Sequence, residues 1–218
     1  MKNKLAFTLA EVLITLGIIG VVAALTIPSL VNNYHKKQYY TQFMKARSIL
    51  ENAKRAYDDE DGSIHEYDVG PESYYSPLIE SMAKHNKGEL IKDLSKITSY
   101  EVKNLNGEIF AETDYFSSDC AVPVNIMFET IDGIDFIYCS AWYGNGVFVD
   151  INGYKNKPNT IGRDIFFIKD MNSDEQASAN SILWNGTNGK WKDGCSNPKE
   201  DDGFTCAGRL LEKGKMDY

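Results

Sequence analysis

The chain has 218 residues, of which 43% are hydrophobic and 25% charged, and its formal net charge is -8. This length and composition fit one folded domain with appendages and exclude a chain that is disordered throughout. The acidic balance argues against a nucleic-acid-binding surface, which needs clustered lysine and arginine. The only charged residues among the first 30 are Lys2, Lys4 and Glu11, so a lipid-compatible segment precedes a water-compatible one.

The first predicted element is an apolar helix long enough to span a membrane. The run from Phe7 to Ile27 is interrupted only by threonine, glycine and Glu11. Its 21 residues extend roughly 31 Å at about 1.5 Å per residue, close to the hydrocarbon thickness of a bilayer. The flank of Lys2 and Lys4 predicts a cytoplasmic N-terminus and an acidic remainder that crosses the membrane.

Glu11 is the unusual residue of this run. A carboxylate inside lipid costs roughly 2.5–3.5 kcal/mol on insertion scales, and the run has no lysine or arginine to offset it. The nearest cation would be a new α-amine, made by cutting the chain just before Phe7. A plain secretory signal peptide ending near residues 22–24 is the competing interpretation, but it would gain nothing from a glutamate in its apolar region.

Residues 5–11, Leu-Ala-Phe-Thr-Leu-Ala-Glu, resemble the processing site of type IV prepilins and type II secretion pseudopilins. The resemblance implies that a prepilin peptidase cuts between Ala6 and Phe7, that the new amine of Phe7 is methylated, and that Glu11 directs assembly. Ala6, also small, stands in place of the family's usual glycine. Pro28 stands where the family often has a proline, and a proline at this place kinks or locally melts the helix.

An amphipathic helix is predicted to continue the chain. Apolar side chains recur every three or four residues, at Tyr39, Phe43, Ala46, Leu50, Ala53 and Tyr57. This spacing gathers them on one helical face, which we expect to pack against a sheet. The alternative is an independent amphipathic helix on the membrane surface. The acidic run at 58–61 and Gly62 end the pattern.

The remaining sequence predicts a small antiparallel sheet. A helix is expected over 76–87, and β-rich runs lie at 124–129, 134–139, 146–150 and 165–168. Asp132-Gly133 between the first two runs is a strong hairpin signal. The predicted fold is therefore α+β and pilin-like: a long N-terminal helix, half membrane-spanning and half amphipathic, packed on a small antiparallel sheet.

This interpretation divides the chain into four parts. They are a leader peptide at 1–6, a transmembrane and assembly helix at 7–33, an amphipathic stalk at 34–57 and an exported globular head at 58–218.

The connection from residue 150 to residue 164 is rich in oxygen ligands. It resembles the Asp-x-Asn-Gly … Pro-Asn … Gly-x-Asp-x-Phe stretch of many pseudopilin and minor-pilin heads. Ca²⁺ takes six to eight hard oxygen ligands, and the candidates are Asp150, Asn152, Asn159 and Asp164 with backbone carbonyls. The spacing is not that of an EF-hand. The alternative is a turn-rich connection whose Asn and Asp side chains bond their own backbone. No other cofactor is expected.

Four cysteines, all in the part expected to be exported, predict two disulfides. Four cysteines allow three connectivities, of which we favour the neighbouring pairs Cys120–Cys139 and Cys195–Cys206. Reduced, buried thiols would be expected instead in a cytosolic protein.

The resemblance implies a structural subunit of a type IV pilus-like or type II secretion pseudopilus filament. Its expected partners are other pilin or pseudopilin subunits, prepilin peptidase and the inner-membrane assembly machinery. Before assembly it would be a single-pass inner-membrane protein with a periplasmic or extracellular head. An enzyme is not expected, because the sequence offers no Ser-His-Asp, Cys-His or His-metal constellation. The remaining alternative is a membrane-anchored, exported binding module that does not polymerise.

Overall fold

The computed structural model describes residues 8–61, 71–92, 94, 97, 100–111, 125–139, 147–169, 183–184, 192 and 194–218. The chain divides into two compact units, Met1–Gln38 and Tyr39–Tyr218. The helices are α1 (Leu9–Asp61), α3 (Pro71–His85) and α5 (Cys206–Lys213). The strands are β1 (Gly88–Ile91), β2 (Val102–Lys103), β3 (Ile109–Ala111), β4 (Asn125–Thr130), β5 (Asp135–Cys139), β6 (Val147–Asp150), β7 (Ile165–Lys169) and β8 (Leu183–Trp184).

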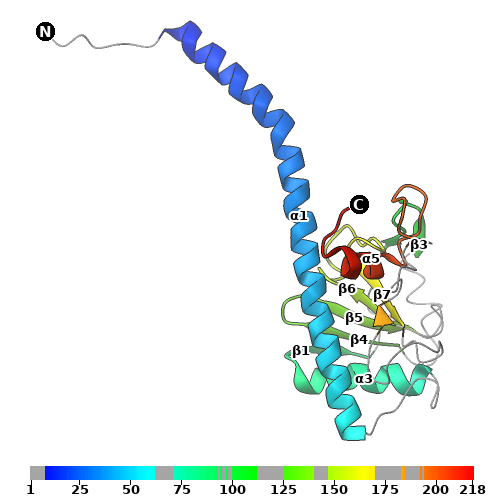
Figure 1. Ribbon diagram of the computed structural model, residues 1–218. Coiled ribbons are helices and arrows are strands. Elements are labelled where there is room, and N and C mark those ends of the chain that lie inside the picture. Colours follow the sequence, from blue (N-terminus) through cyan, green and yellow to red (C-terminus); the bar gives the residue numbers. More distant parts are fainter. Residues whose placement is uncertain are drawn as a thin grey trace, which may run out of the picture. The chain divides into compact units, whose positions relative to one another are not determined.

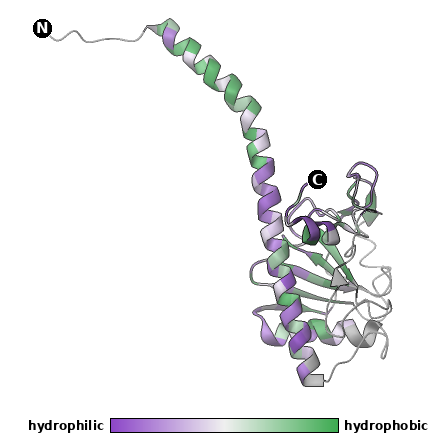
Figure 2. Cartoon of the chain, in the orientation of Figure 1, coloured by the Kyte–Doolittle hydropathy of each residue, from purple (hydrophilic) through white to green (hydrophobic). Residues whose placement is uncertain are grey.

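The part of α1 that lies in the first unit is mostly apolar, and its side chains are exposed. The hydrophobic colouring of its first half is plain in Figure 2. Leu13 is 61% exposed and Leu25 is 76% exposed. Among the described residues, α1 alone is long and apolar enough to cross a membrane by length and composition. The helix is continuous through Pro28.

In the second unit, the later part of α1 packs on the sheet through the predicted apolar face. Phe43 and Ala46 are 0% exposed, Leu50 and Ala53 are 1% exposed, and Tyr57 is 3% exposed. They share one core with α3 and with the sheet, and the Phe43 ring lies 4.8 Å from that of Phe166 on β7. The predicted packing of this helix on a sheet is confirmed, and Figure 1 shows β4 to β7 beside it.

The sheet has six antiparallel strands in the order β1-β4-β5-β6-β7-β8. The four predicted strands are present, with ends displaced by a residue or so, and the Asp-Gly turn joins β4 to β5 with Gly133 at a φ of 75°. The short strands β1 and β8 at its two edges were not predicted. The helix expected over 76–87 is α3, which begins earlier, at Pro71. Proline is well tolerated at a first helical position.

The second face of the sheet carries its own core. Met127, Ile137, Phe148, Ile165 and Phe167 line this face. The residues that cover it are Leu94, Ile97, Tyr100, Val102, Phe110 and Phe204. Because side chains alternate between faces along a strand, Asp135 and Asp150 lie on this second face, at the end of the sheet where the connection from residue 151 to 164 begins.

Candidate functional site

Asp150, the last residue of β6, is fully buried and caps the turn that follows it. Its Oδ1 accepts the backbone N–H groups of Asn152 at 3.2 Å and Gly153 at 2.9 Å. Its Oδ2 accepts the hydroxyl of Tyr100 at 3.0 Å. Gly153 has a φ of 82°, a left-handed conformation that glycine adopts at little cost.

Asp164 closes the other end of the loop in the same way. Its two oxygens accept the N–H groups of Asn159 at 2.8 Å and Thr160 at 2.6 Å. The side-chain amide of Asn152 donates to the carbonyls of Asn156 at 3.4 Å and Lys157 at 3.3 Å. The structure thus brings together the four residues singled out in the sequence, and their side chains bond the loop's own backbone.

Asp135, on the neighbouring strand β5, is the member of this cluster that sequence reasoning missed. It pairs with Asp150 across β5 and β6 and is 0% exposed. Its Oδ2 accepts the N–H of Tyr154, within the loop, at 2.8 Å. A charged residue at the start of an otherwise apolar strand was the available signal, but only the register of β5 on β6 places it beside the loop.

Burial sets the electrostatics of the three aspartates. It raises the pKa of Asp135 to about 7 and that of Asp164 to about 6, although both accept backbone N–H groups that act in the opposite direction. The pKa of Asp150 lies well above its usual value because of burial, and the carboxyls of Asp164 and Asp135 raise it further. The cluster therefore resists holding three negative charges by itself.

Three side-chain oxygens in this region are shielded from solvent and accept no hydrogen bond: Asp135 Oδ1, Asn152 Oδ1 and Asn159 Oδ1. Within the described part of the chain, no three Asp, Glu, His or Cys side chains converge on a metal position. A cation held here would need amide as well as carboxylate oxygens. Ca²⁺ accepts carboxylate and amide oxygens as ligands, and its binding by this loop stays a prediction.

The predicted disulfide Cys195–Cys206 is present, with a Cα–Cα distance of 5.1 Å. The disulfide packs against the loop at Gly162, since a Cβ added to Gly162 would stand 2.8 Å from the Cys206 sulfur. The hydroxyl of Tyr218 donates to the carbonyl of Gly162 at 2.6 Å. The other predicted pair falls outside the described residues, since Cys120 is not among them.

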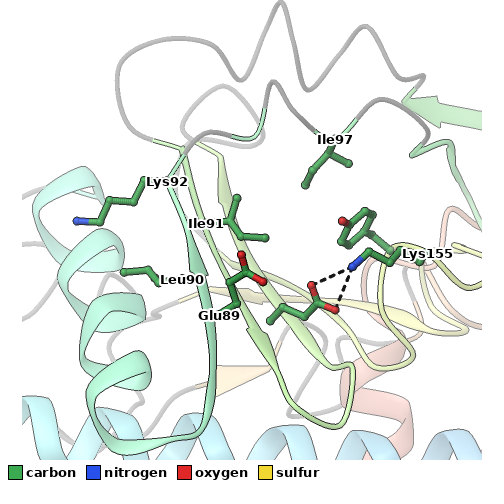
Figure 3. A pocket seen from close by; sticks show the side chains of 8 residues that line it. Glu89, Leu90, Ile91, Lys92, Ile97 and Lys155 are labelled. Atoms are coloured by element: carbon green, nitrogen blue, oxygen red, sulfur yellow. Dashed lines mark hydrogen bonds and ion pairs between the residues drawn. The ribbon is translucent and has the colours of Figure 1, made fainter.

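A surface pocket of about 490 Å³ lies beside the loop. Figure 3 shows its lining: Glu89, Leu90, Ile91, Lys92, Ile97, Glu129, Tyr154 and Lys155. The Lys155 ammonium pairs with a Glu129 oxygen at 3.3 Å and lies 4.8 Å from the centre of the Tyr154 ring. None of these described lining residues is a serine, cysteine or histidine.

At the N-terminus, Glu11 lies in the first turn of α1 and is bonded to Thr8. The backbone N–H and the hydroxyl of Thr8 each donate to Glu11 Oε2 at 2.8 Å. The N–H of Glu11 donates in turn to the Thr8 hydroxyl oxygen at 3.3 Å. This reciprocal arrangement is a capping box, which satisfies N–H groups that the first helical turn leaves free. Sequence reasoning missed Thr8, although Thr-x-x-Glu before an apolar run is the recognised signal.

A known protein family matches this same N-terminal segment. The model described as the prokaryotic N-terminal methylation motif matches residues 1–27. The chain carries the type IV prepilin and pseudopilin signature. No curated protein and no solved structure matches the chain. The likeness to type IV prepilins therefore rests on the N-terminal segment, and the long helix packed on an antiparallel sheet is a pilin-like architecture.

The prepilin signature includes Ala6, Phe7 and Glu11 and ends just before Pro28. Ala6 and Phe7 lie outside the described residues, and cleavage between them stays a prediction. Glu11 and Pro28 are exposed on α1. The prepilin signature and the apolar helix together support a protein anchored in the inner membrane.

Proposed function

We propose that this chain is a structural subunit of a type IV pilus-like or type II secretion pseudopilus filament. In this proposal prepilin peptidase cuts between Ala6 and Phe7, Phe7 is N-methylated, and the subunit assembles through α1. The observation that carries the proposal is the prepilin signature at residues 1–27, which coincides with the start of a long, apolar, exposed helix.

Glu11 would set the height of each subunit in the filament. In the uncut chain its carboxylate is bonded to Thr8, which lowers the cost of placing it among apolar residues. Cleavage would create an ammonium group at Phe7, the cation nearest to Glu11. Pairing that ammonium with Glu11 of a neighbouring subunit would neutralise two charges in a low-dielectric environment, and a subunit at the wrong height would leave both unpaired.

The surface of α1 suits close helix packing. A Cβ added at Gly17 or Gly20 would meet nothing within 4 Å in the single chain. Small residues of this kind let neighbouring helices approach closely in a membrane. Apolar side chains such as Ile14, Ile18 and Val21 are more than half exposed. They would be covered first by lipid and then by the helices of adjacent subunits.

The head would be exported and displayed by the filament. The Cys195–Cys206 disulfide supports this placement, because disulfides persist in oxidising compartments and are rare in the cytosol. The proposal includes two further expectations: the head is periplasmic or extracellular, and the partners of the subunit are other pilin-type subunits and the inner-membrane assembly machinery.

The deciding experiment compares the membrane fraction with filaments sheared from the cell surface. N-terminal sequencing and mass spectrometry should find a chain that begins with methylated Phe7 in both fractions. A chain that begins near Leu25 or Thr26 would show a secretory signal peptide and defeat the proposal. A chain that begins at Phe7 but never enters filaments, even on overproduction, would favour the membrane-anchored binding module.

A further inference from the structure

The pocket beside β1 has the size and the wall chemistry of a binding site. Its volume of about 490 Å³ falls in the usual range of ligand pockets, roughly 300–1,000 Å³. Figure 3 shows Glu89, Ile91 and Ile97 on the pocket side, while Leu90 and Lys92 lie on the other side of β1. This division follows from the alternation of side chains along a strand. The pocket therefore combines a carboxylate with an apolar wall.

Two glutamates stand opposite each other at this pocket. Glu89 on β1 and Glu129 on β4 are partners in the antiparallel register, so both side chains lie on the same face of the sheet. Like charges placed directly opposite are destabilising, and a cation between them removes the repulsion. Glu129 has the Lys155 ammonium as its cation, but no described residue forms an ion pair with Glu89. The pocket thus offers one carboxylate without a partner.

The two glutamates form the outer end of a row of four acidic residues that crosses the sheet. Asp135 on β5 is opposite Glu129, and Asp150 on β6 is opposite Asp135. The two aspartates are fully buried and accept N–H groups of the following loop. Glu89 is exposed and Glu129 is partly exposed. The outer pair is therefore the part of the row that a molecule from outside can reach.

The chain itself already places one ammonium group in the pocket. Lys155 Nζ lies 3.3 Å from a Glu129 oxygen and 4.8 Å from the centre of the Tyr154 ring. Hydrogen bonding to Tyr154 and to Glu129 raises the pKa of Lys155, so these surroundings favour a positive charge. The Lys155 side chain is 62% exposed, and exposed ion pairs contribute little to stability. An incoming cation can therefore displace this ammonium into solvent at little cost. The other lysine of the lining, Lys92, is paired with Glu80 at 2.6 Å.

The walls select an amphipathic cation. Ile91 and Ile97 belong to the apolar core of this face of the sheet, and long basic side chains lay their methylene stems on such surfaces while the charged head stays free. A planar guanidinium binds carboxylates through paired N–H···O bonds and stacks on aromatic rings such as that of Tyr154. The compact ammonium of a lysine lacks this fork. Arginine is therefore the side chain that matches the apolar, aromatic and acidic walls together.

We propose that this pocket binds an arginine side chain of a partner protein, with its guanidinium between Glu89 and Glu129 and against the Tyr154 ring. The methylene stem lies on the apolar wall, and Lys155 turns into solvent. The formal net charge of -8 favours the approach of a basic segment. The proposal concerns the head and stands whether or not the chain enters filaments.

The test uses the full-length chain in detergent, with its isoleucine methyl groups labelled for NMR. The probe is the peptide acetyl-Gly-Arg-Gly-amide, and the same peptide with neutral citrulline in place of arginine is its matched control. The arginine peptide should shift the methyl signals of Ile91 and Ile97 to saturation and leave that of Ile131, 72% exposed in the β4–β5 turn, unchanged. The citrulline peptide should shift none of them. Absence of a shift at both pocket isoleucines, or equal binding of the two peptides, overturns the proposal.

Two variants and a control assign the site. Glu89→Gln removes the unpaired carboxylate from an exposed position and should weaken binding of the arginine peptide by at least about fivefold. Glu108→Gln is the control, because it removes the same charge from the exposed turn between β2 and β3 and should keep the wild-type affinity. Lys155→Met removes the competing ammonium and should tighten binding about threefold, a gain that misfolding cannot imitate. Wild-type affinity in Glu89→Gln, or unchanged or weaker binding in Lys155→Met, overturns the proposal.

Discussion

Asp135 on β5 and Asp150 on β6 stand opposite each other in the sheet, both fully buried, and both hold the same turn of the following loop. Asp150 accepts the N–H of Gly153, and Asp135 accepts the N–H of Tyr154, the next residue. The turn is therefore fixed to two strands by two carboxyl groups. This relationship fixes the start of the loop to one end of the sheet.

Substitution Glu11→Ala should leave membrane insertion intact and abolish or strongly reduce entry into filaments. Removing a carboxylate from an apolar run favours insertion by roughly 2.5–3.5 kcal/mol, while the partner of the Phe7 ammonium is lost. The measurement is the amount of the chain in membrane and sheared-filament fractions, with Glu89→Ala in the exposed part of β1 as control. Normal incorporation of Glu11→Ala would refute the assembly role.

Substitution Gly162→Ala should destabilise the head by about 2–4 kcal/mol, since it combines a clash with backbone strain. The new Cβ would stand 2.8 Å from the Cys206 sulfur and 2.9 Å from the Gly203 Cα, at a φ of 81°. Gly107→Ala is the control: its φ is 91°, but a Cβ there meets nothing within 4 Å. Chemical unfolding should show a clearly larger loss for Gly162→Ala. Equal losses of stability would mean that backbone strain alone destabilises both variants and that the loop does not pack tightly against the disulfide.

Replacing Cys195 and Cys206 together by alanine should lower the free energy of unfolding by about 2–4 kcal/mol, mainly because the unfolded chain regains freedom. The paired cysteines are separated by 11 positions, and both are 0% exposed. Denaturant unfolding of the oxidised wild type and the double variant measures the difference. The double variant should also show a smaller response to reducing agent than the wild type. If the two proteins unfold at the same denaturant concentration, the disulfide contributes nothing to the head.

Substitution Leu50→Ala should cost about 2–5 kcal/mol, the usual range for a large side chain truncated in a core. Leu50 is 1% exposed on the face of α1 that packs on the sheet. Ile131→Ala is the control in the same unit, because Ile131 is 72% exposed in the β4–β5 turn. Thermal melting followed by circular dichroism checks both. A melting temperature unchanged by Leu50→Ala would contradict the packing of this helix on the head.

Much of the architecture follows from local patterns. The spacing of Phe43, Ala46, Leu50, Ala53 and Tyr57 identifies the buried face of α1, and Asp132-Gly133 identifies the β4–β5 hairpin, because helix periodicity and turn conformation depend on neighbours in the chain. The edge strands β1 and β8 were missed because strands of four and two residues carry too little pattern to recognise. Thr8 was within reach, since its capping-box spacing with Glu11 is local.

The sequence by itself determined the apolar N-terminal helix with its prepilin signature and the amphipathic face that follows, and it left three connectivities open for the four cysteines. Only the tertiary structure decided that Asp135 joins Asp150, Asn159 and Asp164, and that the disulfide lies against Gly162. The physical reason is that these contacts depend on strand register and on the packing of segments far apart in the chain. Each such contact is set by the fold as a whole and by no run of neighbouring residues.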